Sequence, residues 1–155
     1  MINPSDVGVV VGSHLPGIGG TVRMALRGVG FRRIAAVVDQ RGLLDGFAAA
    51  EPRVAVIYVE SGQESDPGLQ MLKFLRRSET SPDRRIPVVA LSPSRDIATI
   101  RAVMNGGVHE YLLFPASGEA LLKKIEAAMS TTRGFVDTPD YVGPQQRTAT
   151  GLRPS

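Results

Sequence analysis

The sequence predicts an α/β fold: five parallel strands alternating with five helices in a doubly wound (βα)5 sheet of strand order 2-1-3-4-5. The first observation is that short β-branched runs alternate along the chain with amphipathic stretches. The second is that these apolar runs are nearly continuous rather than alternating, which is typical of strands buried on both faces. The hydrophobic content of 43% and charged content of 21% are ordinary for a globular protein. We therefore expect one domain over residues 1–130.

The expected strands are the apolar runs, which cover residues 7–11, 34–38, 54–59, 87–91 and 110–113. Between them, apolar residues at helical spacing predict helices over residues 18–29, 43–48, 67–75, 97–104 and 121–129. Gly30 suits the position just after the first helix, Pro67 suits a first helical turn, and Ser117 is a candidate N-cap of the last helix.

The periodicity ends at Thr131. Residues 131–155 are rich in Thr, Pro, Gly and Gln, which predicts a C-terminal tail that is extended or docked on the domain. Phe135 and Val142 are among its few apolar anchors.

The charge of the chain does not by itself indicate a partner. The net charge is +3, but the basic residues form short separate pairs, which usually lie on solvated faces. These pairs are Arg32-Arg33, Arg76-Arg77, Arg84-Arg85 and Lys123-Lys124. No nucleic-acid-binding motif accompanies them, and no apolar run approaches the roughly 20 residues that span a bilayer. We expect a cytoplasmic protein without nucleic acid or membrane partners, and the absence of cysteine excludes disulfides and thiolate metal sites.

Ligands of an open parallel sheet bind at the carboxyl ends of its strands, so the residues that follow each strand matter most. These are Gly12 and Ser13 after the first strand, Asp39 after the second, Tyr58 and Glu60 at the third, Ser92 at the fourth and Phe114 at the fifth.

The order of elements and two segments resemble the response-regulator receiver (CheY-like) family over roughly residues 6–130. The segments are RIPVVALS at 85–92 and NGGVHEYLLFP at 105–115. The tail is similar to the ending of certain single-domain bacterial receivers, through RGFV at 133–136 and YVGPQQR at 141–147.

The resemblance implies a site for phosphoryl transfer, and the sequence departs from it at each charged position. In receivers an acidic pair holds Mg²⁺, an Asp accepts the phosphoryl group and a Lys pairs with it. These positions fall here on Gly12 and Ser13, on Tyr58 and on Phe114, none of which carries a charge. Since Mg²⁺ at such a site needs carboxylate oxygens, we expect weak or absent Mg²⁺ binding, no cofactor and no enzymatic activity.

Two registers remain open for the acceptor position. Tyr58 lies six residues after Pro52, whereas the usual spacing of eight residues before Gly68 gives Glu60. Tyr58 is preferred, because loops accept insertions more readily than buried strands. If Glu60 occupies the position, its carboxylate could mimic a phosphorylated acceptor. Glu60, Glu64 and Asp66 could also hold a metal, although a solvated acidic loop is the simpler interpretation.

Ser92 and Tyr111 match the switch hydroxyl and the switch aromatic of receivers. The resemblance therefore implies an atypical stand-alone receiver that acts by protein–protein contact in two-component (phosphorelay) signalling. Its partners would be a histidine kinase, another response regulator or a second copy of the chain. The expected contact residues are Ile97, Ile100, Arg101, Met104, Tyr111 and Leu122.

A different class of function is a small nucleotide-binding module of Rossmann type. Gly17, Gly19 and Gly20 follow a strand, and Asp39 comes about twenty residues later. The glycine pattern fails at Val22, where a small residue belongs. His14 follows Ser13 directly in the sequence, and no catalytic triad order is visible around it. Both histidines, His14 and His109, are interpreted as incidental, with His109 at the surface.

Overall fold

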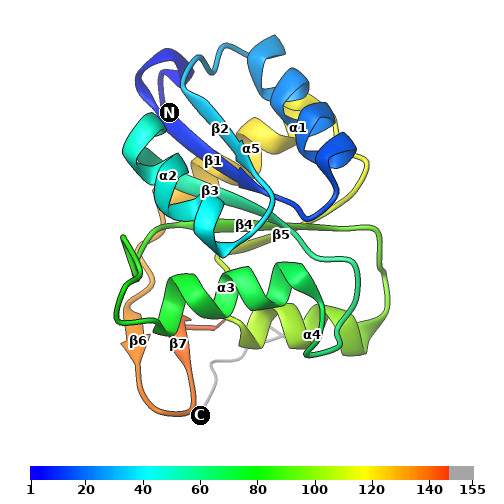
Figure 1. Ribbon diagram of the computed structural model, residues 1–155, viewed down its shortest axis with the longest axis vertical. Coiled ribbons are helices and arrows are strands. Elements are labelled where there is room, and N and C mark those ends of the chain that lie inside the picture. The colour runs from blue at the N-terminus through cyan, green and yellow to red at the C-terminus, as the bar shows by residue number, and fades with distance from the viewer. Residues whose placement is uncertain (147–155) are drawn as a thin grey trace.

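The computed structural model describes residues 1–146, and its five-stranded sheet has the predicted parallel order β2-β1-β3-β4-β5 (Figure 1). The strands are β1 (Gly8–Gly12), β2 (Ile34–Val37), β3 (Pro52–Tyr58), β4 (Val88–Ser92) and β5 (Glu110–Leu113). The helices are η1 (Pro4–Asp6), α1 (Pro16–Gly28), α2 (Gln40–Ala50), α3 (Pro67–Arg77), α4 (Ile97–Asn105) and α5 (Gly118–Met129).

Helices cover both faces of the sheet, which explains the continuous apolar strands. Alternate residues of the strands point to opposite faces. Val9, Val11 and Val56 pack with α1 and α5 on one face, whereas Val10 and Ile57 pack with α2, α3 and α4 on the other.

Local capping explains where several elements begin and end. Pro67 opens α3, and the Asp66 carboxylate before it accepts hydrogen bonds from the backbone N–H groups of the first turn. The Ser117 hydroxyl accepts the N–H of Ala120 at the start of α5, as expected for an N-cap. Gly30 follows α1 with a φ of +106°, a conformation that glycine adopts without strain.

The predicted strand boundaries differ from the observed ones by up to two residues. β1 and β4 start one residue later than expected and continue to Gly12 and Ser92. β3 starts at Pro52 rather than at residue 54, because a strand tolerates proline as its first residue.

The tail forms an antiparallel hairpin as far as Gln146. Its strands are β6 (Phe135–Asp137) and β7 (Val142–Pro144), and Figure 1 shows them beside the ends of α3 and α4. Strands of three residues leave no periodic signal, so neither strand could be predicted from the sequence. The remaining tail residues, 147–155, lie outside the described part of the chain.

Candidate functional site

The carboxyl edge of the sheet brings together the residues that follow β1, β3, β4 and β5. Gly12 is the register partner of Ile57, so Ser13 and Tyr58 come next on neighbouring strands. The N–H of Phe114 donates to the carbonyl of Ser92 at 2.9 Å, which places the ends of β4 and β5 side by side.

Tyr58 and Phe114 form an aromatic contact at this edge. Their ring centroids are 5.6 Å apart at an interplanar angle of 78°, an edge-to-face arrangement that aromatic pairs favour. Tyr58 is 4% exposed and packs into the core cluster under α1 and α5, with Phe114 half-buried against the same cluster. Burial raises the pKa of the Tyr58 hydroxyl, and the charges of Glu60 and Asp66 raise it further. The centre of the edge is therefore an apolar, uncharged contact.

At the end of β1, a side chain at position 12 would meet the ends of two core side chains. A Cβ atom added to Gly12 would lie 2.9 Å from Cδ1 of Ile57 and 3.0 Å from Sδ of Met71. Ser13 is buried, and its hydroxyl donates to the carbonyl of Leu15 at 3.0 Å and accepts the N–H of Leu15 at 3.1 Å. The Ser13 hydroxyl thus fixes the turn into α1 and offers no charged ligand.

The loop after β3 separates Glu60 from the buried edge. The side chain of Glu60 is 53% exposed, and its Oε2 lies 3.9 Å from Nε2 of His14. The Nδ1 atom of His14 is buried without a hydrogen-bond partner in the part of the chain that the structure describes.

Asp66 organises this loop, a role that the sequence interpretation did not assign to it. One carboxylate oxygen accepts the N–H groups of Glu60 and Ser61 at 3.1 and 2.9 Å. The other accepts those of Gly68 and Leu69 at 2.9 and 3.2 Å. Four backbone donors therefore occupy the buried carboxylate. Among residues 1–146 no cluster of three or more His, Cys, Asp or Glu side chains could hold a metal ion.

The two switch-like residues meet at Ser94. The buried Ser92 hydroxyl accepts the N–H of Ser94 at 3.2 Å, and the Tyr111 hydroxyl donates to the carbonyl of Ser94 at 2.6 Å. The loop between β4 and α4 is thus held by both side chains. Ser94 had no distinguishing signal in the sequence.

The six expected contact residues lie on α4, β5 and α5, which are neighbours in the fold. Ile97 is 64% exposed and Arg101 is also exposed, whereas Ile100, Met104, Tyr111 and Leu122 are half-buried.

At the opposite end of the sheet, two of the four basic pairs, Arg76-Arg77 and Arg84-Arg85, contact the tail hairpin rather than lying free on the surface as expected. Arg76 is 1% exposed, and its guanidinium lies 5.3 Å from the ring centroid of Phe135, with that of Arg85 at 5.0 Å. Arg77 donates to the carbonyl of Pro139, and Arg84 pairs with Asp137.

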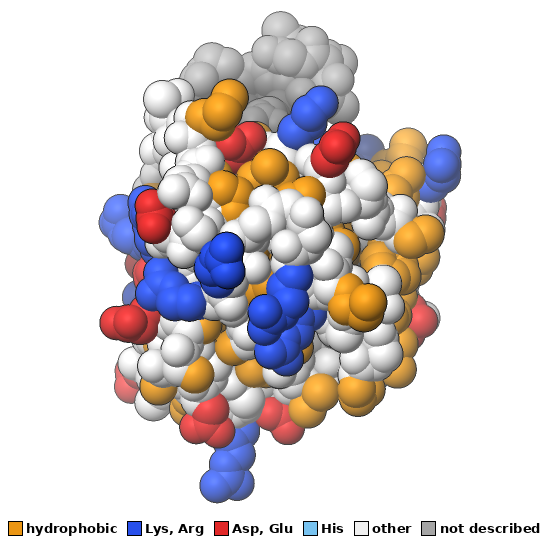
Figure 2. Space-filling view, turned by 90° about the horizontal axis from the view of Figure 1, so that it is seen from above, with side chains coloured by type: hydrophobic (Ala, Val, Ile, Leu, Met, Phe, Trp, Pro, Cys, Tyr) orange, Lys and Arg blue, Asp and Glu red, His pale blue; other side chains and the backbone are white. Residues whose placement is uncertain are grey.

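The buried guanidinium of Arg76 donates to three backbone carbonyls, those of Gly107, Arg84 and Ile86, at 2.8–2.9 Å. Burial lowers the pKa of Arg76 to about 10. His109 is buried beside it, contrary to the expected surface position, and its Nδ1 accepts the N–H of Val88 at 3.1 Å. Figure 2 shows the Lys and Arg side chains of one face interspersed with acidic and uncharged ones.

The residues of the nucleotide-binding alternative are not arranged as a phosphate-binding loop. Gly17, Gly19 and Gly20 lie inside α1, which already begins at Pro16. Asp39 is the N-cap of α2, and its Oδ1 accepts the N–H of Gly42 at 2.8 Å. This geometry does not favour a nucleotide site of Rossmann type. Within residues 1–146 no helix is long and apolar enough to cross a bilayer.

No protein-family model matches the chain. Ninety residues, 58% of the chain, are 27% identical to the two-component response regulator-like protein APRR1 of Arabidopsis thaliana. This match spans only 14% of APRR1, so the chain is similar to one part of a much longer protein.

Solved receiver domains share the architecture. Chemotaxis protein CheY4 of Vibrio cholerae superposes with a TM-score of 0.64 at 19% identity, covering 79% of this chain and 98% of CheY4. The REC domain of RcsB from Salmonella enterica serovar Typhimurium superposes with a TM-score of 0.60 at 15% identity, covering 90% and 94%. With the strand order and the helix arrangement described above, the chain has the fold of the CheY-like response-regulator receiver domains.

Proposed function

We propose that the chain is an atypical receiver module that acts in two-component signalling by protein–protein contact, without phosphorylation of an aspartate and without enzymatic activity. The observation that carries the proposal is the edge-to-face contact of Tyr58 and Phe114 at the carboxyl edge of the sheet. A phosphoryl group would need a carboxylate acceptor and nearby cations there. An apolar contact at that position supports loss of the chemistry.

The acceptor position is assigned to Tyr58 in this proposal. Its support is that Tyr58 ends β3 inside the core and touches Phe114, whereas the Glu60 side chain is largely exposed in the loop and lies near His14. The two additional loop residues are accommodated by the hydrogen bonds that Asp66 makes to the backbone of Glu60 and Ser61.

The residues at the same carboxyl edge of the sheet also support weak Mg²⁺ binding. Mg²⁺ usually binds through one or two carboxylates together with water. Gly12 has no side chain, the Ser13 hydroxyl is occupied by Leu15, and the Asp66 carboxylate accepts four N–H groups. Releasing Asp66 for a metal would leave those four donors unpaired.

The first experiment exposes the full chain to beryllofluoride and Mg²⁺ and records ¹H–¹⁵N NMR spectra, with acetyl phosphate and intact-mass spectrometry in parallel. The isolated REC domain of RcsB, which has been crystallised with this phosphomimetic, serves as the positive control. We expect no saturable spectral change and no added phosphoryl mass. A stoichiometric adduct on Glu60, or on any residue at the end of β3, would overturn the proposal.

The second experiment tests the contact surface formed by Ile97, Ile100, Arg101, Met104, Tyr111 and Leu122. A panel of purified histidine kinases and response regulators is screened against the immobilised chain, and self-association is followed by analytical ultracentrifugation. Ile97→Glu places a charge on the most exposed apolar residue of the surface, and we expect it to weaken binding at least tenfold. Met24→Glu is the matched control, since Met24 is 75% exposed on α1, outside this surface. Equal binding by both variants, or no binding to any panel member or to itself, would contradict the proposal.

A further inference from the structure

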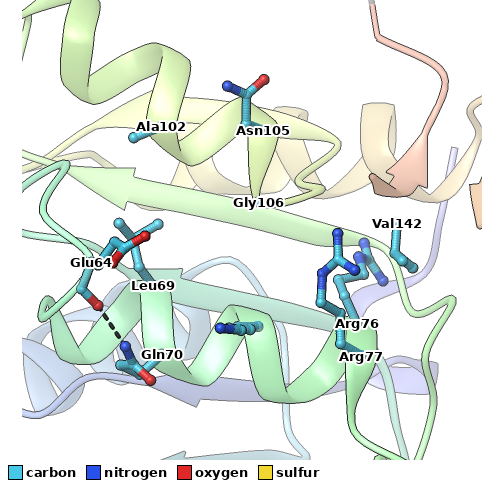
Figure 3. Close-up of a pocket in the computed structure, with 10 residues that line it drawn as sticks. Glu64, Leu69, Gln70, Arg76, Arg77, Ala102, Asn105, Gly106 and Val142 are labelled. Carbon is cyan, nitrogen blue, oxygen red and sulfur yellow. Dashed lines mark hydrogen bonds between the residues drawn. The ribbon is translucent and has the colours of Figure 1, made fainter. Parts of the chain in front are cut away.

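A pocket of about 260 Å³ lies between α3 and α4, away from the carboxyl edge discussed above. Its apolar lining comes from Leu69 of α3, Ala102 of α4 and Val142 of the tail hairpin. Figure 3 shows Ala102 and Asn105 on the α4 side of the pocket, and Leu69 and Gln70 on the α3 side. Three segments that are distant in sequence therefore build one cavity.

The pocket has an acidic side chain at one end and basic side chains at the other. Figure 3 shows Glu64 beside Gln70 at one end, where the Gln70 amide donates to the Glu64 carbonyl, and Arg77 at the other end. Lys73 and Arg77 also line the pocket and are one helical turn apart, a spacing that brings side chains within about 6 Å of each other. One end of the pocket is therefore cationic.

Within residues 1–146 these two cations are not neutralised by a carboxylate. In residues 1–146 neither Lys73 nor Arg77 has a carboxylate within ion-pair distance, and Arg77 donates only to the Pro139 carbonyl. Arg76, which lines the same wall, is satisfied by backbone carbonyls and adds further positive charge. The wall can thus accept an anion without breaking an internal ion pair.

We propose that this pocket binds a small organic anion, an aliphatic carboxylate whose head group lies between Lys73 and Arg77. Its hydrocarbon chain would extend over Leu69 and Ala102, while Val142 lies beside Arg76 and Arg77 at the head-group end. The volume lies just below the 300–1,000 Å³ typical of ligand pockets, which limits the ligand to roughly ten non-hydrogen atoms. Glu64 at the opposite end excludes a second carboxylate there and sets the orientation.

Binding at this place would connect ligand occupancy to the contact surface. Ala102 and Asn105 belong to α4, the helix that also carries Ile97 and Arg101. A ligand that binds one arrangement of α3, α4 and the hairpin more tightly shifts the population toward it. This regulatory consequence rests on the proposed function, whereas the binding itself does not.

The test is a titration of the ¹⁵N-labelled full chain with sodium hexanoate, followed by the amide signals of Leu69, Ala102 and Gly106. We expect saturable shifts at these amides in the millimolar range, as suits a ligand of eight non-hydrogen atoms, and no saturable shift with the neutral analogue hexanamide. Lys73→Ala and Arg77→Ala should each weaken binding at least fivefold. Lys123→Ala, which removes an exposed lysine of α5, should leave it unchanged.

Three outcomes overturn the proposal: no saturable shift up to 50 mM hexanoate, equal shifts with hexanamide, or equal affinity in all variants. Urea unfolding of each variant without ligand separates lost binding from lost stability, since cations in the second half of a helix also stabilise its dipole. No signalling partner is present in this experiment. Its failure would therefore leave the proposed protein–protein function untouched.

Discussion

Replacement of Arg76 by Ala should destabilise the whole domain by about 3–5 kcal/mol. Three hydrogen bonds from its charged guanidinium to buried carbonyls are each worth about 1.5–3 kcal/mol. Burial of the positive charge opposes this stabilisation. It lowers the pKa of Arg76 to about 10, which corresponds to a cost of roughly 3 kcal/mol in folding free energy. The difference is about 1.5–6 kcal/mol, and the carbonyls of Gly107, Arg84 and Ile86, left unpaired in the Ala variant, keep the loss away from the lower end of that range.

The assay is urea unfolding monitored by far-UV circular dichroism, because the chain has no tryptophan. For a domain of this size the expected loss corresponds to a Tm lower by about 10 °C. Arg76→Lys, which keeps a charge but cannot reach all three carbonyls, should lose less and keeps the test usable if the Ala variant does not fold. Arg23→Ala, at an exposed position of α1, should stay within about 0.5 kcal/mol of the parent.

The reasoning is refuted if Arg76→Ala loses less than about 1 kcal/mol. The location of the effect is checked by limited proteolysis with trypsin, whose cleavage after Arg133 should accelerate in the variant. Unchanged protection of Arg133 would show that the hairpin is held without Arg76.

Three further predictions concern the carboxyl edge. Gly12→Ala should cost up to about 1 kcal/mol, because the ends of the Ile57 and Met71 side chains must shift, whereas Gly20→Ala, with open space around its Cβ, should stabilise α1 by up to about 1 kcal/mol. Urea unfolding compares the two variants. Asp66→Ala should cost about 2–4 kcal/mol because four N–H groups lose their acceptor. Asp96→Ala should cost under about 1 kcal/mol, since Asp96 makes no side-chain capping bond. Equal losses in the two variants would contradict the role of Asp66 in holding the loop after β3. Burial raises the pKa of Tyr58, so the folded state retains a proton that the unfolded chain releases above pH 10, and the free energy of unfolding falls as the pH rises further. Tyr58→Phe should reduce this fall, which unfolding curves at pH 9, 10 and 11 measure.

The fold could be predicted because its signals are local. The central strands β1, β3 and β4 are buried and the edge strands β2 and β5 are half-buried, and all five leave short apolar runs in the sequence. Pro67, Gly30 and Ser117 mark helix ends through backbone chemistry that does not depend on distant residues. The strand ends were less well defined, since the burial of Gly12 and Ser92 depends on neighbouring elements.

For the candidate site, the sequence positions of the residues could be predicted, but their contacts could not. The sequence indicates that Tyr58 and Phe114 follow neighbouring strands, but not that their rings touch. It did not assign Asp66 as the acceptor of four N–H groups, although an Asp before Pro-Gly is a recognisable N-cap. Nor did it separate Arg76 from its neighbour Arg77, because burial of one arginine in a basic pair depends on the tail hairpin, which has no periodic signal.

The two ends of the sheet bury different charged side chains, and those at the amino end have contacts with the tail. The carboxyl edge holds the uncharged contact of Tyr58 with Phe114 and the buried Asp66 carboxylate, whose hydrogen-bond partners belong to the neighbouring loop and to α3. The amino end buries Arg76 and Glu110, with Arg133 of the tail paired to Glu110 at 3.7 Å. Removing residues 131–155 would strip partners from both buried charges, so a truncated chain would report on folding as well as on partner binding. A chain ending at Gln146 keeps every described contact of the hairpin. It is therefore the construction in which a role of residues 147–155 in recognition can be measured separately from the stability of the domain.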